Sequence, residues 1–298
     1  MKDPIVQPAR ALKESVDLCA EADELHAFLL TLSPADWERP TQFMGWTPWD
    51  VVAHLHFFDE MSLAALEGAD VFAARRDALI AELGRRRTNR EIARERYAGL
   101  SPGALLERWI TSCREMAKQL GESNPERRLP WFGPDMGVRM FTTARLMETW
   151  AHGQEIYDLV GATRKPTDRL KHIATIGVKT FGWTFANRGQ KPPGPPPYVR
   201  LVAPSGAVWE WNGPKEGNGP KEGNGPKERN GPKDGNTPGE SDRVEGDALD
   251  FCLVVTQARN VKDTHLFVKG DVATRWMEIA QCFAGGPVDP PKPGTRGA

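Results

Sequence analysis

The first 190 or so residues repeat a single pattern, in which apolar side chains recur at every third or fourth position between polar ones. In the segment 9–32, for example, Leu12, Val16 and Cys19 keep this spacing, with acidic residues between them. Because an α-helix turns once in about 3.6 residues, such positions form one apolar stripe along a helix. Several amphipathic helices in succession, with no strand signal between them, predict a helical bundle.

Hydroxyl and proline residues mark where two of these helices begin. Thr47 stands before Pro48 and Asp50, which gives an N-cap hydroxyl, a proline in the first turn and an acid at the third position. Ser101 and Pro102 repeat the same start. The expected helices span 9–32, 48–66, 101–120 and 141–161, with a fifth at 167–189. We therefore expect one helical domain over residues 1–192.

The character of the sequence changes at Tyr198. Two β-rich runs in "YVRLVAPSGAVWEWN" flank Pro-Ser-Gly, which is typical of a hairpin. The unit NGPKEG and its variants then repeat four times over 212–236, and their glycine, proline and alternating charge cannot bury a core. Helical, strand and helical patterns follow. These features predict an α+β fold, with a small α+β domain over 193–286, a flexible insertion at 212–240 and a disordered tail over 287–298.

Composition excludes several classes of function. The chain of 298 residues has a net charge of -1, so nothing in it favours nucleic acid or an anionic membrane as a partner, and the basic run 84–90 is interpreted as a solvated connection. It contains no run of eighteen apolar residues and no apolar segment near its N-terminus. Four cysteines lie far apart and form no C-x-x-C pair: Cys19, Cys113, Cys252 and Cys282. We expect a cytoplasmic, reduced protein that is a monomer or a homodimer.

Two histidines and one glutamate fall on the apolar stripes of two expected helices. His54 keeps a stripe with Phe58, so its ring is expected to face the interior. His56, two residues further on, is turned roughly to the opposite side and is interpreted as a surface residue. On the later helix, Glu148 and His152 are four residues apart on an equivalent stripe.

This arrangement has two interpretations. If the helices are neighbours, two imidazoles and one carboxylate meet inside the bundle, which is a common ligand set of catalytic zinc and leaves a fourth position for water or substrate. Alternatively, Glu148 pairs with His152 or with Arg145 in a hydrogen-bonded core cluster, because a carboxylate in an apolar interior needs a partner or a metal. Periodicity alone leaves both interpretations open.

Two segments resemble a known family. "GWTPWDVVAHLHFFDE" (45–60) is similar to the G-W-x-x-x-D-V-x-x-H-L segment of the DinB-like superfamily, in particular of the N-terminal domain of mycothiol-dependent maleylpyruvate isomerases. "ARLMETWAHGQEIYDLVG" (144–161) resembles the E-x-W-x-H segment of that family. The C-terminal part resembles the family's small α+β domain. The resemblance, which spans most of the chain apart from the repeat, implies a DinB-like four-helix bundle followed by that domain.

The resemblance also implies the residues of a site. Carried over position by position, the ligands of a divalent metal, usually taken as zinc, become His54, Glu148 and His152. An arginine that helps to bind substrate or thiol becomes Arg259 in "ALDFCLVVTQAR", although alanine precedes it where the family has glycine. Glu155 stands where the family has aspartate, and it is expected to orient a ligand or to close a salt bridge.

The chemistry that this resemblance implies depends on a thiol. A low-molecular-weight thiol such as mycothiol, held as thiolate at zinc, would act on a small organic substrate in an isomerisation or a transfer. One alternative is a metal-dependent hydrolase with Glu155 or Asp50 as its base. Another is a non-catalytic metal-binding protein in which His56 or Glu155 is a fourth ligand. The cysteines are interpreted as buried small hydrophobes. Four tryptophans are interpreted as packing residues, with the lining of an apolar pocket as the less favoured alternative: Trp46, Trp49, Trp131 and Trp150.

Overall fold

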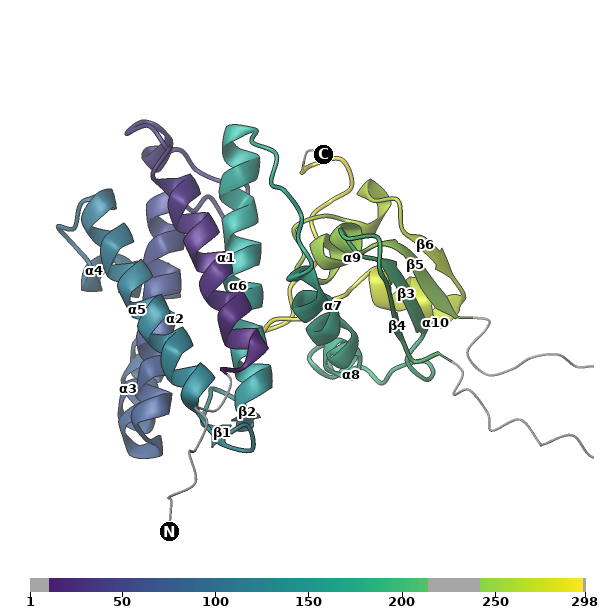
Figure 1. Ribbon diagram of the computed structural model, residues 1–298, viewed down its shortest axis with the longest axis horizontal. Helices are drawn as coiled ribbons and strands as arrows, with labels where there is room; N and C mark the ends of the chain where they lie inside the picture. Colours follow the sequence, from purple (N-terminus) through teal and green to yellow (C-terminus); the bar gives the residue numbers. More distant parts are fainter. Residues whose placement is uncertain (1–10, 214–241, 297–298) are drawn as a thin grey trace, which may run out of the picture. The chain divides into compact units, whose positions relative to one another are not determined.

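The computed structural model describes residues 11–213 and 242–296. The chain divides into two compact units, Met1–Lys165 and Pro166–Ala298. The first is helical and the second contains helices and a sheet, which makes the fold α+β, as the sequence predicts (Figure 1). The division falls between Lys165 and Pro166 rather than near residue 192, because the fifth predicted helical segment packs with the second unit.

Four long helices form the bundle of the first unit, which confirms the prediction from periodicity. Their bounds are α1 Lys13–Leu29, α2 Pro48–Glu67, α5 Pro102–Glu122 and α6 Val138–Val160. Helices α1 and α2 each pack on both α5 and α6, so that the apolar stripes close around one core. Fully buried side chains such as Leu18, Leu55 and Trp109 fill this core. The bundle therefore sets α2 beside α6, the two helices that carry the candidate ligands.

The sequence pattern does not predict the shorter helices between α2 and α5. These are α3 (Ala69–Gly84) and α4 (Asn89–Arg96), and a 3-10 helix, η1 (Asp36–Glu38), precedes α2. Both α3 and α4 pack on α2. The buried residues of α3 are Phe72 and Leu79, too few to stand out as an apolar stripe. The basic run 84–90 connects α3 to α4, in agreement with its interpretation as a connection.

The start of α2 is fixed by the cap that the sequence predicts. The Thr47 hydroxyl accepts a hydrogen bond from the Asp50 N–H, and the Asp50 carboxylate accepts one from the Thr47 N–H at 2.9 Å. Asp50 also accepts from Arg90 Nε at 2.9 Å and from Arg94 Nη2 at 2.8 Å, both on α4. Burial would raise the pKa of Asp50, but the hydrogen bonds from Arg94, Arg90 and the Thr47 N–H hold it below its ordinary value. Asp50 is thus an ionised structural group, committed to the cap and to α4.

We expect Thr47→Ala to lower the free energy of unfolding by about 1 kcal/mol, because the first turn of α2 loses its side-chain acceptor. Urea denaturation followed by circular dichroism measures this. Thr47→Ser is the matched control, since it keeps the hydroxyl and should stay within about 0.5 kcal/mol of the wild type. Equal losses in the two variants would show that packing of the threonine methyl, rather than the cap, stabilises this position.

A short antiparallel ribbon leads into α6. Its strands are β1 (Arg128–Leu129) and β2 (Met136–Gly137). The turn between them carries Trp131 and Phe132, and the rings of both lie near Phe58 of α2. The ribbon therefore sets two aromatic side chains close to the helix that carries His54.

The second unit contains a four-stranded sheet of order β4-β3-β5-β6. Its strands are β3 (Tyr198–Val202), β4 (Val208–Trp211), β5 (Arg243–Asp247) and β6 (Phe267–Lys269). The predicted hairpin is confirmed, because β3 and β4 pair antiparallel across the turn at Gly206, whose φ of 84° favours glycine. The sequence pattern does not predict β5, which pairs parallel to β3 and antiparallel to β6. Its polar residues give it little intrinsic strand preference, so pairing on both sides must stabilise it.

Among the described residues of this unit, four α-helices accompany the sheet: α7 (Leu170–Lys179), α8 (Phe181–Ala186), α9 (Ala248–Val255) and α10 (Asp271–Met277). The predicted fifth helix of the chain is thus two helices, α7 and α8. Helix α7 packs on α9 at Gly177, where an added Cβ would lie 2.9 Å from a methyl carbon of Val255. This close approach explains why the segment belongs to the second unit. In the described ranges, no helix is long and apolar enough to span a membrane.

The sequence predicts a flexible repeat insertion and a disordered C-terminal tail, and the structure describes mainly the second of these segments. Most of the repeat insertion predicted at 212–240 lies outside the described residues. Residues 287–296, predicted to be disordered, are instead held by hydrogen bonds: Asn260 Nδ2 donates to the Pro291 carbonyl at 2.8 Å, and the Gly294 N–H donates to Asp263 Oδ1 at 2.9 Å. Glycine and proline make this segment look disordered in the sequence, whereas side chains of the second unit satisfy its backbone groups.

Candidate metal centre

Three side chains from two helices meet inside the first unit. His54 comes from α2, and Glu148 and His152 come from α6. Glu148 Oε2 lies 3.6 Å from His54 Nε2 and 3.3 Å from His152 Nε2. One ligand atom from each residue lies within 4.8 Å of the other two. The two helical stripes therefore meet in the folded chain, as the family resemblance implies.

The spacing of these atoms fits a small cation. Ligand atoms about 2.0–2.2 Å from a tetrahedral zinc lie roughly 3.3–3.6 Å from each other, which matches the separations of Glu148 Oε2 from the two histidine nitrogens. His54 Nε2 is buried and has no hydrogen-bond partner, although a buried polar atom without a partner normally costs free energy. A metal ion between the three side chains would satisfy this nitrogen. Two imidazoles and one carboxylate are also a donor set that zinc prefers.

The local electrostatics keep the donors in the state that binds a cation. Burial, reinforced by the neighbouring His152, lowers the pKa of His54 to about 4, so its imidazole is neutral at pH 7. Burial would raise the pKa of Glu148, but its interactions with His152 and His54 hold the pKa well below the ordinary value. The site thus offers an ionised carboxylate and a neutral His54 at neutral pH, as metal ligation requires.

Aromatic rings flank the two imidazoles. The Trp46 ring is parallel to the His152 ring at 5.8 Å and is tilted against the His54 ring at 5.1 Å. The Phe43 ring meets the edge of the His152 ring at 5.1 Å, and the Phe58 ring lies 4.8 Å from the His54 ring. Of the four tryptophans considered from the sequence, Trp46 is thus the one whose ring packs on the cluster; packing contacts of this kind restrict how the imidazoles rotate.

A tight loop places Trp46 over the cluster. The Thr41 N–H donates to the Trp46 carbonyl at 2.7 Å, which closes the loop. Met44 and Gly45 have φ values of 52° and 66°, in the left-handed region that glycine adopts most easily. Gly45, which stands before the tryptophan in the sequence motif, is therefore the residue that allows the chain to turn back toward α2.

The prediction that His56 lies on the surface is wrong. Its side chain is 4% exposed, its ring packs 4.9 Å from the ring of Tyr97, and its Nε2 lies 3.9 Å from Glu60 Oε1. The reason is that α4, which the sequence pattern does not predict, packs on α2 and brings Tyr97 with it. Within the described residues, the cluster of potential ligands consists of His54, Glu148 and His152, so His56 is not a fourth ligand.

The two other predicted site residues have separate places. Glu155 is a buried residue of α6, three positions after His152, and it is not a member of the ligand cluster found among the described residues. Arg259 belongs to the second unit, shortly after α9. Its N–H donates to the Leu253 carbonyl at 3.1 Å and its Nη1 donates to the carbonyl of the residue before it at 2.9 Å. The roles of both residues remain predictions.

A buried ion pair that the sequence pattern does not predict joins the same two helices. Arg145 of α6 donates from Nε and Nη2 to Asp59 Oδ1 of α2, at 3.1 and 2.9 Å. Trp109 Nε1 of α5 donates to Asp59 Oδ2 at 3.1 Å. Arg145, considered as a partner of Glu148, is therefore bonded to Asp59 instead. The stripe of His54 and Phe58 does not mark this pair, because Asp59 is adjacent to Phe58 rather than three or four residues from it.

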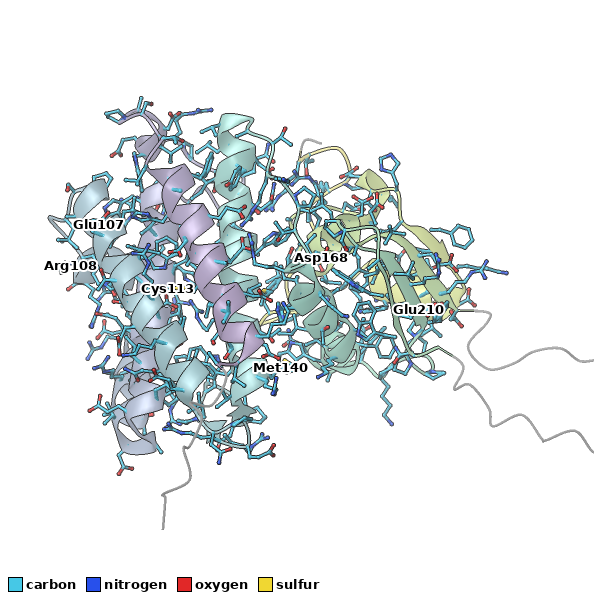
Figure 2. The ribbon with its side chains drawn as sticks, in the orientation of Figure 1. Glu107, Arg108, Cys113, Met140, Asp168 and Glu210 are labelled. Carbon is cyan, nitrogen blue, oxygen red and sulfur yellow. The ribbon has the colours of Figure 1, made fainter. Side chains whose placement is uncertain are left out.

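The cysteines have the surroundings of packing residues rather than of nucleophiles. Cys113, Cys252 and Cys282 are buried, and Cys19 is half-buried; Figure 2 labels Cys113 in the helical unit. Burial raises the pKa of the Cys113 and Cys252 thiols, and burial together with the nearby Asp23 carboxylate raises that of Cys19. These three thiols are protonated at neutral pH.

Comparisons with known proteins show what this chain is similar to. Residues 18–157 match the family model described as the mycothiol maleylpyruvate isomerase N-terminal domain. Two curated proteins, from two strains of Mycobacterium tuberculosis, are each 35% identical over 271 residues, covering 91% of this chain and 95% of theirs; both are described as uncharacterized. A solved structure of mycothiol-dependent maleylpyruvate isomerase is 15% identical with a TM-score of 0.48, covering 86% of this chain and 91% of that one. A solved structure of a histidine-to-alanine mutant of that enzyme is 14% identical with a TM-score of 0.47, covering 81% of this chain and 87% of that one.

Proposed function

We propose that this chain, which belongs to the mycothiol maleylpyruvate isomerase family, is an enzyme that uses a divalent metal and a low-molecular-weight thiol to isomerise or transfer a group on a small organic substrate. The observation that carries the proposal is the cluster of His54, Glu148 and His152, whose spacing suits a cation. Zinc is the metal that we propose, because two imidazoles and one carboxylate are a ligand set of catalytic zinc. Mycothiol is the thiol that the family's name suggests.

The residues of the cluster would hold the metal and leave room for one more ligand. A bound divalent metal would lower the pKa of a thiol and favour its nucleophilic thiolate form at neutral pH. Glu148 supplies one negative charge, so a divalent ion would keep net positive charge to attract an anionic ligand. Trp46, Phe43 and Phe58 would limit access of water from the sides where their rings lie.

The thiol must then come from a co-substrate rather than from the chain. Cys19, Cys113 and Cys252 have pKa values raised by burial, so their thiols are poor nucleophiles at neutral pH. Cys282 is also buried. A site that binds its nucleophile from solution needs no protein nucleophile.

Two further residues complete the proposal. The guanidinium of Arg259 would bind a carboxylate of the substrate or of the thiol, because a planar guanidinium pairs with a carboxylate through two parallel hydrogen bonds. Glu155, one turn after His152, would orient that ligand or balance charge beside it. A substrate that bears a carboxylate is therefore expected.

Metal analysis of the purified protein, followed by isothermal titration calorimetry, tests this function. We expect about one zinc per chain in the wild type, and binding of mycothiol that disappears both after chelation and in His54→Ala. Glutathione in place of mycothiol measures how specific the thiol site is. Zinc bound without any thiol effect would instead support a hydrolase or a structural metal site, and absence of zinc would refute the proposal.

A further inference from the structure

Hydrogen bonds between buried charged side chains connect α2 and α6 next to the cluster of His54, Glu148 and His152. Asp59 is fully buried and Arg145 is 3% exposed. Both hydrogen bonds that Arg145 donates to Asp59 are accepted by the same oxygen, Oδ1. The other oxygen, Oδ2, accepts from Trp109 Nε1. The carboxylate thereby links α2, α6 and α5 at one point in the core of the bundle.

This link lies close to the ligands along both helices. Asp59 follows His54 by five residues on α2, and Arg145 precedes Glu148 by three residues on α6. At 1.5 Å per residue these separations are about 7.5 and 4.5 Å along the helix axes. A rotation or a slide of α2 against α6 that separates His54 from Glu148 would also break the Arg145–Asp59 hydrogen bonds.

We propose that the Asp59–Arg145 pair is a positioning device, which fixes α2 against α6 so that His54 meets Glu148 and His152 at the separation a metal ion requires. Apolar side chains of similar volume could fill the same space, and burying two charges brings little net stability. Hydrogen bonds differ from apolar contacts because they are directional, so they select one rotation and one register of the helices. This inference rests on the proposed function, because it assigns a role in metal binding.

The pair also sets the charge beside the site, and two substitutions separate this effect from positioning. Asp59→Asn leaves the Arg145 guanidinium without its counter-charge, whereas Arg145→Met removes that positive charge. If charge alone mattered, the first change would weaken binding of a divalent cation and the second would strengthen it. If the pair positions the helices, both changes weaken binding.

The experiment measures zinc affinity by competition with a chromophoric chelator, and the visible spectrum of the cobalt-loaded protein as a report on ligand geometry. We expect Asp59→Asn and Arg145→Met each to lower zinc affinity by about tenfold or more and to change the cobalt spectrum. Arg145→Lys keeps the positive charge but loses the pair of hydrogen bonds to Asp59, and it should also weaken zinc binding. It is the milder variant to use if Asp59→Asn or Arg145→Met fails to fold.

Glu21→Gln is the matched control. Glu21 is 1% exposed and forms an ion pair with Arg164, which is itself buried, but this pair links α1 to the segment after α6 rather than α2 to α6. We expect this variant to unfold at lower urea concentration, with zinc affinity within about threefold of the wild type and an unchanged cobalt spectrum. The proposal is overturned if zinc affinity is unchanged in Asp59→Asn and Arg145→Lys, if Arg145→Met binds more tightly, or if Glu21→Gln weakens binding equally. A wild type that binds no zinc refutes the proposed function, and this inference with it.

Discussion

His152→Ala is expected to abolish stoichiometric zinc binding, lowering the affinity by more than about 100-fold. His152 supplies one of the three donor atoms of the cluster, and its Nε2 lies 3.3 Å from Glu148 Oε2. Loss of a group that merely orients a ligand costs about 10- to 100-fold in metal affinity, so loss of a ligand itself must cost more. Competition with a chromophoric chelator, measured on the metal-free protein, gives the zinc affinity directly.

His26→Ala is the control for this measurement. His26 lies on α1 of the same unit, and its Nε2 is 3.1 Å from Glu107 Oε1, on the exposed side of α5; Figure 2 labels Glu107. This histidine also contacts a glutamate, but the described residues place no second imidazole with that pair in a ligand cluster. We expect zinc affinity to be unchanged in this variant. Full zinc occupancy in His152→Ala would refute the ligand assignment.

The helical bundle and the inward-facing positions of the candidate ligands could be predicted from the sequence, because each depends on one helix at a time. Periodicity decides which face of α2 carries His54, and which face of α6 carries Glu148 and His152. The cap at Thr47 is encoded within four residues and is found as predicted. That the two stripes meet depends on how the helices pack, and here the family resemblance, rather than periodicity, supplied the prediction.

The features that the sequence analysis missed all depend on partners distant in the chain. His56 is buried because α4 covers the side of α2 that its position would otherwise expose. Asp59 and Arg145 stand 86 residues apart, and a charged residue in a helix is normally expected to face water until its partner is known. Strand β5 forms because β3 and β6 pair with it on either side, against the preference of its polar residues.

The metal-free protein is expected to lose stability on mild acidification, because the side chain of His54, only 13% exposed, is a neutral imidazole. Burial and the nearby His152 lower its folded-state pKa to about 4, whereas in the unfolded chain it returns to an ordinary value of about 6.5. Between these two values the unfolded chain binds more protons than the folded one. The stabilisation is therefore fully present above pH 6.5 and is lost as the pH falls toward 4, by about 3 kcal/mol in total.

Urea denaturation of the metal-free wild type and of His54→Gln, at pH 7 and pH 5, isolates this contribution. The wild type should lose about 2 kcal/mol more than the variant between these pH values, because the other titrating groups are common to both. Glu148 adds to the loss only at lower pH, because its pKa is held below the ordinary carboxyl value and its contribution fades as the carboxylate is protonated. Equal losses of stability in the wild type and in His54→Gln would mean that His54 is not desolvated in the folded protein. Its Nε2 would then be in contact with water, and it would no longer count as a buried nitrogen that lacks a partner.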